Sequence, residues 1–370
     1  MINVSALLET RDTPGHIAPI SDGHPTSATR PTSLTDRPIV AWNPVARCPN
    51  RCRGSILTTI QAKRVLDDLA AFAVGTVIFC GDDIWAREDL IELVRHGSDR
   101  GLRIHLANDG TRISPSRAVG LAGAGLRRMG IAIDGTPETH DRLHATPSAF
   151  HDATSALNRI RRSGIPCAVN FTLQRSNAQE LSAALGVVLR HETPAFRLHH
   201  SVPFADPTHH STVAYETRVE VLRQLFAFAM AFPEVEVTTT NNCFDGVELA
   251  IWIAHSNPRR AHRIREILRT QSAQTRPKSG HITLLHGCGC VHPDHYSADI
   301  VLGNIHEESF SAIWQERYSE WLSARRLRDG ALDTRCARCP ELGVFGTMRP
   351  EGMPQRIMRG NPDWALPTFV

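Results

Sequence analysis

The sequence lacks a long apolar run, and it lacks an excess of charge of either sign. No apolar stretch in its 370 residues approaches the roughly 20 residues of a membrane span. The 41 Lys and Arg residues nearly balance the 38 Asp and Glu residues. These absences argue against a membrane or nucleic-acid partner, so we expect a protein that acts on a small-molecule or peptide substrate.

The first 36 residues also lack the apolar core of a secretory leader. Scattered Pro, Ser and Thr residues predict a disordered tail over 1–36, and the absence of a leader predicts a cytoplasmic location. The length predicts about two further domains. We place them at 37–232, where the pattern is regular, and at 233–370, where it is not.

Short apolar runs alternate with amphipathic stretches between residues 37 and 232. Runs that are apolar almost throughout are typical of parallel strands buried on both faces, and the stretches between them place apolar residues on one face of a helix. The runs are residues 38–42, 76–80, 102–107, 128–133, 168–173 and 196–202. Six such units predict an α/β fold, either an open parallel barrel or a doubly wound sheet.

Polar residues follow several of these expected strands, where parallel α/β folds place their sites. Two cysteines four residues apart, Cys48 and Cys52, follow the first strand, and Ser55 stands where a third cysteine would complete a CxxxCxxC motif. The later strands are followed by Gly81, Asp82, Asp83, Asn108, Asp109 and Asp134. Asp82 and Asp83 are candidates for binding an amine, and a solvated turn explains them equally well. For Asp134, the residues alone favour ordinary turn chemistry.

Nine cysteines are present, and six of them form close pairs: Cys48/Cys52, Cys288/Cys290 and Cys336/Cys339. In a chain without a leader such pairs indicate metal binding more often than disulfides. We predict that the last two pairs meet and hold one zinc ion or a small iron–sulfur cluster, since four thiolates suit either. The alternative is that both pairs are metal-free remnants.

The motifs taken together resemble the radical-SAM family with a C-terminal SPASM or twitch-type extension. The resemblance rests on Ile39–Asn43 with its cysteines, on Cys80–Ile84, Asp109–Thr111 and Ala132–Gly135, and on Leu302–Ile305. Within this family the likeness is closest to the haem synthase that installs the oxo groups of the dioxo-isobacteriochlorin haem of nitrite reductase. It implies a partial parallel (β/α)6 barrel followed by a small SPASM/twitch-like region.

The resemblance also implies two cofactors. Family members hold a [4Fe-4S] cluster on the three cysteines of CxxxCxxC and bind S-adenosylmethionine at the cluster and at the glycine-rich turn after the second strand. It assigns the cluster role to Cys48, Cys52 and the position of Ser55, and S-adenosylmethionine contacts to Gly81, Asp82, Asp83, Asp109 and Asp134. This chain departs from the pattern at Ser55, because a serine hydroxyl is a poor substitute for a thiolate.

Two functions therefore remain open from the sequence. In the first, the chain is a divergent radical-SAM/SPASM protein without regular radical chemistry, which binds a tetrapyrrole or a peptide in a biosynthetic pathway. In the second, it is an active oxidoreductase of this fold, haem-synthase-like or peptide-modifying, with an altered iron–sulfur or other metal site. The metal content of the purified protein separates the two.

Overall fold

The structure is a computed structural model that describes residues 1–9, 37–48, 54–81, 83–201, 213–242, 244–274, 282–294, 297 and 299–329. Its strands are β1 (Ile2–Asn3), β2 (Ile39–Asn43), β3 (Thr76–Cys80), β4 (Arg103–Asn108), β5 (Arg128–Ala132), β6 (Cys167–Leu173), β7 (Ala195–His200), β8 (Glu236–Thr240), β9 (Ile282–His286), β10 (Cys290–His292) and β11 (Gly303–Asn304).

Helices connect these strands. They are α1 (Val4–Glu9), α2 (Thr59–Ala71), α3 (Leu90–Asp99), α4 (Pro115–Gly123), α5 (Pro137–Leu143), α6 (Ala149–Arg162), α7 (Leu181–Arg190), α8 (Tyr215–Ala231), α9 (Asp245–Ala254), α10 (Pro258–Gln274), α11 (Phe310–Ile313) and α12 (Ser319–Asp329), with a 3-10 turn at Ile84–Ala86 and a π-helical turn at Trp314–Tyr318.

Local sequence explains where several helices begin. Thr58 and Gln61 form a reciprocal capping box at the start of α2, which satisfies two backbone donors that the first turn leaves open. Ser114 and Thr136 cap α4 and α5, and a proline occupies the first turn of each. Proline suits that position because its fixed φ matches the helix and its missing N–H is not needed there.

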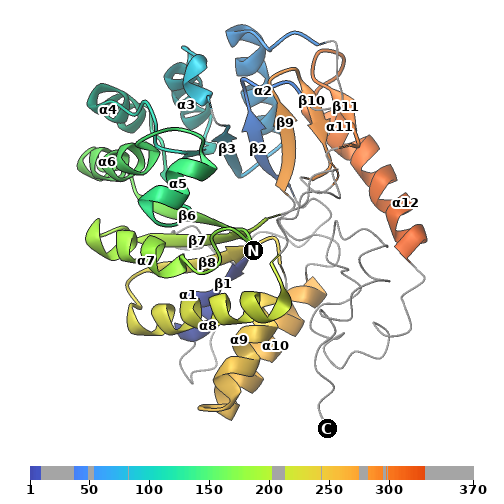
Figure 1. The fold of residues 1–370 in the computed structure, drawn as a ribbon. Helices are drawn as coiled ribbons and strands as arrows, with labels where there is room; N and C mark the ends of the chain where they lie inside the picture. The colour runs from blue at the N-terminus through green and yellow to red at the C-terminus, as the bar shows by residue number, and fades with distance from the viewer. Residues whose placement is uncertain are drawn as a thin grey trace.

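The strands form one sheet in the order β1-β8-β7-β6-β5-β4-β3-β2-β9-β10-β11. Every pairing from β2 through β8 is parallel. The sheet curves around an interior, and the connecting helices lie along its outer face (Figure 1). The main apolar core fills the layer between sheet and helices and contains the alternate residues Ile104, Leu106, Phe196 and Leu198. The predicted parallel α/β barrel is therefore confirmed.

The sheet continues beyond the six predicted strands at both edges. β8 adds a parallel strand after β7, and β9 pairs in parallel with β2 over all five residues, from Ile39 opposite Ile282 to Asn43 opposite His286. The predicted disordered tail is wrong for its first residues, because β1 pairs with β8 and α1 buries Val4, Leu7 and Leu8. Residues 10–36 lie outside the described part of the chain.

The C-terminal region packs against the start of the barrel. β9, β10 and β11 form an antiparallel extension of the sheet next to β2. Asp68 of α2 accepts hydrogen bonds from the backbone N–H of Ser311 at 3.0 Å and from its hydroxyl at 2.7 Å, which fixes α11 to the barrel. In the described residues, no helix has the length and apolarity needed to cross a membrane.

Candidate functional site: a thiol cluster where the loop after β2 meets the turn after β9

Three cysteine sulfurs meet at the carboxyl end of β2. The Sγ atoms of Cys48, Cys288 and Cys290 all lie within 4.8 Å of one another. The three side chains are at most 5% exposed and form a cluster of their own, separate from the apolar core. Cysteines that are 240 residues apart in the sequence thus form one buried group of potential metal ligands.

The pairing of β2 with β9 brings these cysteines together. Since Asn43 and His286 end the two strands side by side, the loop after β2 and the turn after β9 leave the sheet at the same edge. Backbone hydrogen bonds then tie them together: the N–H of Gly287 donates to the carbonyl of Ala46 at 2.8 Å, and the N–H of Leu57 donates to the carbonyl of Gly287 at 2.7 Å.

Glycines make this approach sterically feasible. A Cβ on Gly287 would lie 2.6 Å from the carbonyl oxygen of Pro44, and a Cβ on Gly54 would lie 2.7 Å from that of Cys288. Both distances are closer than real Cβ atoms approach backbone. Gly289 has a φ of +83°, which a residue with a side chain adopts only with strain. The turn Gly287–Cys290 therefore needs glycine on either side of Cys288.

Arg87 fixes the loop that carries Cys48. Its buried guanidinium donates from Nη1 to the carbonyl of Leu57 at 2.9 Å and to that of Pro44 at 3.3 Å. Its Nε lies 2.9 Å from Asp89, which balances the charge. Since Pro44 and Leu57 flank the cysteine loop on either side, one side chain holds both of its ends.

Two of the cysteine sulfurs accept hydrogen bonds. The backbone N–H of Cys48 donates to Sγ of Cys288 at 3.3 Å, and Nδ2 of Asn304 donates to Sγ of Cys290 at 3.4 Å. Asn304 Nδ2 also donates to the carbonyl of Cys288 at 3.2 Å, so β11 holds the turn from the other side. Donors directed at sulfur stabilise a thiolate, and in iron–sulfur proteins such bonds tune the reduction potential.

The other predicted site residues have mixed surroundings. Cys52, Asp82, Cys336 and Cys339 lie outside the described residues. Ser55 is exposed, and its carbonyl lies 3.0 Å from Nε2 of His306. Asp83 forms an exposed ion pair with Arg112 at 2.6 Å. Gly81 has a φ of +130° and passes against Asn43, and Asp109 accepts from the N–H and hydroxyl of Thr111 within its own turn.

Asp134 belongs to a second compact group, together with His140 of α5 and His144, which directly follows α5. Potential ligand atoms of the three residues lie within 4.8 Å of one another. The carboxylate of Asp134 accepts from the backbone N–H of Thr172 at 2.7 Å and lies 3.0 Å from Nε2 of His144. The N–H of Asp134 donates to Nδ1 of His140 at 3.1 Å.

These hydrogen bonds argue against a metal at the second group. Burial lowers the pKa of His140 to about 4, His144 lowers it too, and Asp134 partly offsets both. His140 is therefore neutral near pH 7. Because its Nδ1 accepts a hydrogen bond from the backbone N–H of Asp134, its Nε2 carries the ring hydrogen and has no lone pair to bind a metal. We interpret Asp134–His140–His144 as a structural group that joins β5, α5 and β6.

Sequence reasoning missed two features of these sites. It did not join Cys48 to Cys288 and Cys290, because the β2–β9 pairing leaves no local pattern. It also overlooked His140 and His144, although two histidines four residues apart on a predicted helix share one face and were a usable signal.

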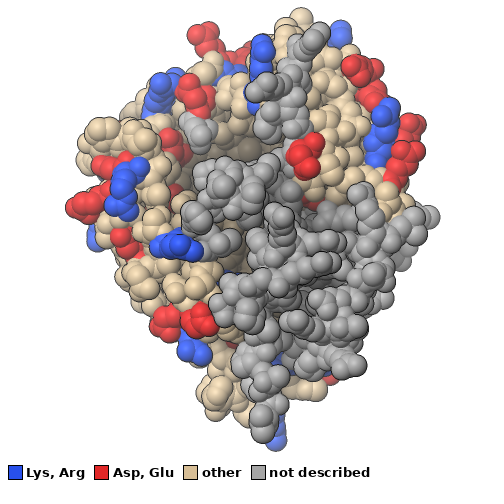
Figure 2. All heavy atoms as spheres, turned by 45° about the vertical axis from the view of Figure 1, so that its right-hand side comes forward, with Lys and Arg blue, Asp and Glu red and all other residues tan. Residues whose placement is uncertain are grey.

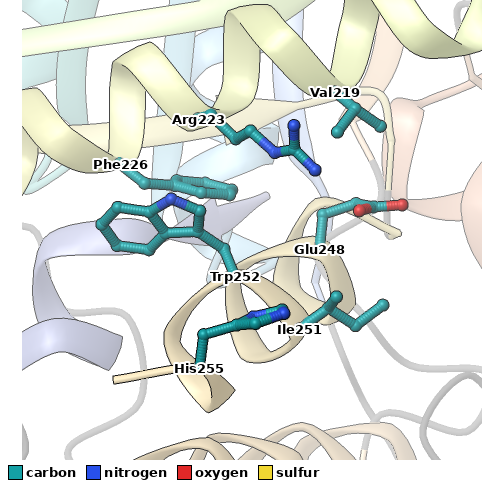
Figure 3. A pocket seen from close by; sticks show the side chains of 7 residues that line it. All are labelled: Val219, Arg223, Phe226, Glu248, Ile251, Trp252 and His255. Atoms are coloured by element: carbon teal, nitrogen blue, oxygen red, sulfur yellow. The ribbon is translucent and has the colours of Figure 1, made fainter. Parts of the chain in front are cut away.

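A separate concavity lies outside the barrel, between α8 and α9. It has a volume of about 310 Å³ and is lined by Val219, Arg223, Phe226, Glu248, Ile251, Trp252 and His255 (Figure 3). Phe226 and Trp252 form its apolar wall, and Arg223 and Glu248 extend over its other side. None of the cysteines or the rim residues described above contributes to it. We assign it no role in the chemistry.

This chain has a curved parallel β/α sheet, with cysteines at the carboxyl end of its first barrel strand. That combination is typical of barrel proteins that bind an iron–sulfur cluster. Residues 42–185 match the radical SAM superfamily, and residues 285–340 match SPASM, an iron–sulfur cluster-binding domain. The chain therefore belongs to the radical-SAM/SPASM family, whose domains bind iron–sulfur clusters and S-adenosylmethionine.

Relatives and structures agree with this placement. The chain is 28% identical to Fe-coproporphyrin III synthase of Methanosarcina barkeri over 84% of this chain and 83% of that protein. It is 26% identical to pre-heme d1 synthase of Dinoroseobacter shibae over 87% and 84%. PqqA peptide cyclase of Bradyrhizobium diazoefficiens is 33% identical, over 36% and 39%. The crystal structure of Streptococcus suis SuiB bound to S-adenosylmethionine shares the fold, with a TM-score of 0.63 and 10% identity over 84% and 72%.

The residues present fit a thiolate-bound group. Three buried sulfurs, two of them with hydrogen-bond donors, match the soft ligands that select zinc or iron–sulfur clusters. A reduced cluster held by these sulfurs would supply the electron for cleavage of S-adenosylmethionine. The chain's own residues hold the sulfurs in place through Arg87 and Asn304, and they keep water away from them.

Proposed function

We propose that this chain is a haem-synthase-like radical-SAM protein that binds a tetrapyrrole bearing several carboxylates. The observation that carries the proposal is coverage. Two relatives named as haem or porphyrin synthases align with more than four fifths of this chain, and three named AdoMet-dependent heme synthase align with 38–43% of it. The peptide cyclase aligns with little more than a third. A tetrapyrrole is therefore favoured over a peptide.

The interior face of the barrel supports an anionic substrate. Strand residues that alternate with the core residues point to the other face of the sheet. On that face β4 carries His105, β5 carries Arg128, and β7 carries Arg197 and His199. Glu236 offsets Arg128 at 2.7 Å. On the described surface in view, Lys and Arg side chains are interspersed with Asp and Glu side chains, and neither sign forms a large patch (Figure 2).

The thiol cluster favours an active oxidoreductase with an altered iron–sulfur site over a scaffold without radical chemistry. Three buried thiols lie within 4.8 Å of one another, and N–H groups are directed at two of them. This arrangement suits a set of thiolate ligands.

Binding of iron coproporphyrin III, followed by its absorption band, tests the substrate class. We expect saturable binding that Arg197→Gln weakens by about ten- to a hundredfold, since a hydrogen bond to a charged group contributes roughly 1.5–3 kcal/mol. Arg190→Gln is the matched control, because Arg190 is exposed at the end of α7. Equal affinity of the two variants would contradict a site on the interior face.

Activity is tested separately, by anaerobic incubation with S-adenosylmethionine and dithionite. Formation of 5′-deoxyadenosine in amounts above the protein concentration supports the oxidoreductase. Porphyrin binding without this product would instead identify the scaffold function.

A further inference from the structure

We propose that Cys48, Cys288 and Cys290 form one three-thiolate ligand set for an iron–sulfur cluster, in which the turn after β9 supplies two thiolates from outside the CxxxCxxC pattern. Cys52 lies outside the described residues and is not part of this set. This inference concerns the protein's own cluster and does not depend on the identity of the substrate. It differs from the pairing expected from sequence spacing, in which Cys288 and Cys290 meet Cys336 and Cys339.

The first support is the number of thiolates. The CxxxCxxC pattern provides three, and this chain has serine at the third position. Ser55 is exposed, while the three clustered cysteines are at most 5% exposed. A hydroxyl facing water does not replace a buried soft ligand. The structure nevertheless brings three thiols together at the same strand end, two of them from the other end of the chain.

The second support is the way that the fold is built around the contact. The turn meets the cysteine loop through backbone hydrogen bonds at Gly287 on one side and through the close approach of Gly54 on the other. Arg87 holds the loop ends at Pro44 and Leu57. Among the described residues, the buried cluster between the loop and the turn consists of these three cysteines alone.

The third support concerns the occupant. Cys288 and Cys290 lie within residues 285–340, which match an iron–sulfur cluster-binding domain, and Cys48 lies within the radical SAM match. The three sulfurs lie within 4.8 Å of one another, so they can serve one centre. One zinc ion at about 2.3 Å from each sulfur would hold them at most about 4.6 Å apart, whereas in a cluster each thiolate binds its own iron. Acid-labile sulfide distinguishes these two occupants.

The experiment measures iron, acid-labile sulfide and zinc per chain after anaerobic purification and reconstitution. The test variants are Cys48→Ala and Cys288→Ala/Cys290→Ala. Cys167→Ala is the matched control, because Cys167 is an equally buried cysteine on β6, away from the site. Cys336→Ala/Cys339→Ala tests the alternative pairing. We expect the test variants to lose iron, sulfide and the visible absorption of the cluster, while Cys167→Ala keeps them and Cys336→Ala/Cys339→Ala keeps the cluster held at Cys48.

Iron and sulfide that remain in Cys288→Ala/Cys290→Ala would overturn the proposal, and so would zinc without sulfide in the wild-type chain. Circular dichroism and gel filtration show whether the variants fold. A second measurement on the wild-type chain needs no variant: alkylation before and after acid removal of the cluster, mapped by mass spectrometry. The proposal predicts that Cys48, Cys288 and Cys290 become reactive together, while the reactivity of each one independently of the other two would contradict it.

Discussion

Among the described residues, two groups have the composition of a metal site, and they differ in the hydrogen bonds that their donor atoms make. Cys48, Cys288 and Cys290 meet where β2 and β9 end, and Asp134, His140 and His144 meet beyond β5. In the second group, backbone N–H groups donate to the carboxylate of Asp134 and to Nδ1 of His140, and Asp134 also lies 3.0 Å from Nε2 of His144. In the first, N–H groups are directed at sulfurs that still have lone pairs to offer a metal. The hydrogen-bond pattern, not the residue types, separates the two.

We expect the largest difference between the two groups from the substitution Arg87→Ala. It removes the hydrogen bonds to Pro44 and Leu57 and leaves Asp89 without its partner. We expect a loss of about 3 kcal/mol in the free energy of unfolding, as when one partner of a buried ion pair is removed, together with a loss of bound iron. Chemical denaturation measures the first effect and iron analysis the second. Arg161→Ala, which breaks an exposed pair with Glu192, should cost less than about 1 kcal/mol and leave iron unchanged.

Acid should weaken the second region through His140. Its pKa is about 4 in the folded chain, against an ordinary value of 6.5, so the unfolded chain binds more protons between these values. The stabilisation by neutral His140 is complete above about pH 6.5 and is lost as the pH falls to 4, by at most about 3 kcal/mol. Unfolding of wild type and His140→Gln at several pH values checks this. An unchanged pH slope in the variant would contradict it.

His286 is the matched group beside the thiol cluster. Burial lowers its pKa to about 4 as well, with a further contribution from His292. It therefore titrates in the same window, and it remains in the His140→Gln variant. The effect of His140 is therefore the difference between wild type and His140→Gln in the slope of the unfolding free energy against pH.

Asp134→Asn should give a smaller effect, confined to stability. The amide keeps one acceptor for the N–H of Thr172, but its NH₂ then faces Nε2 of His144. We expect a loss of about 2 kcal/mol, within the range for an unsatisfied buried polar group, and the same iron per folded chain as wild type. Loss of iron in Asp134→Asn would show that the second region contributes to the cluster after all.

Ser55→Ala should have the smallest effect. Its side chain is exposed, so the free energy of unfolding should change by less than about 0.5 kcal/mol. The iron content should be unchanged, since Cys288 and Cys290 supply the thiolates. An iron content that falls in Ser55→Ala would make this serine a ligand and would refute the proposed ligand set.

The sequence predicted the barrel well because its signals are local. Each apolar run from Ile39 to His200 became a strand within one or two residues of its expected limits. The predicted strand ends also showed that Asp109 and Asp134 lie at the carboxyl edge of the sheet, since they follow β4 and β5. The contact between Cys48 and the turn after β9 was not predictable in this way, since it depends on a parallel pairing of strands far apart in the chain. The two-residue strand Ile2–Asn3 is too short for any periodicity.

An anomalous difference map at the iron absorption edge, from crystals grown without oxygen, would show directly where iron binds. We expect its strongest peak between the Sγ atoms of Cys48, Cys288 and Cys290, with no peak at Asp134, His140 and His144. A peak that leaves Cys288 and Cys290 unligated, or one at the second region, would contradict this expectation.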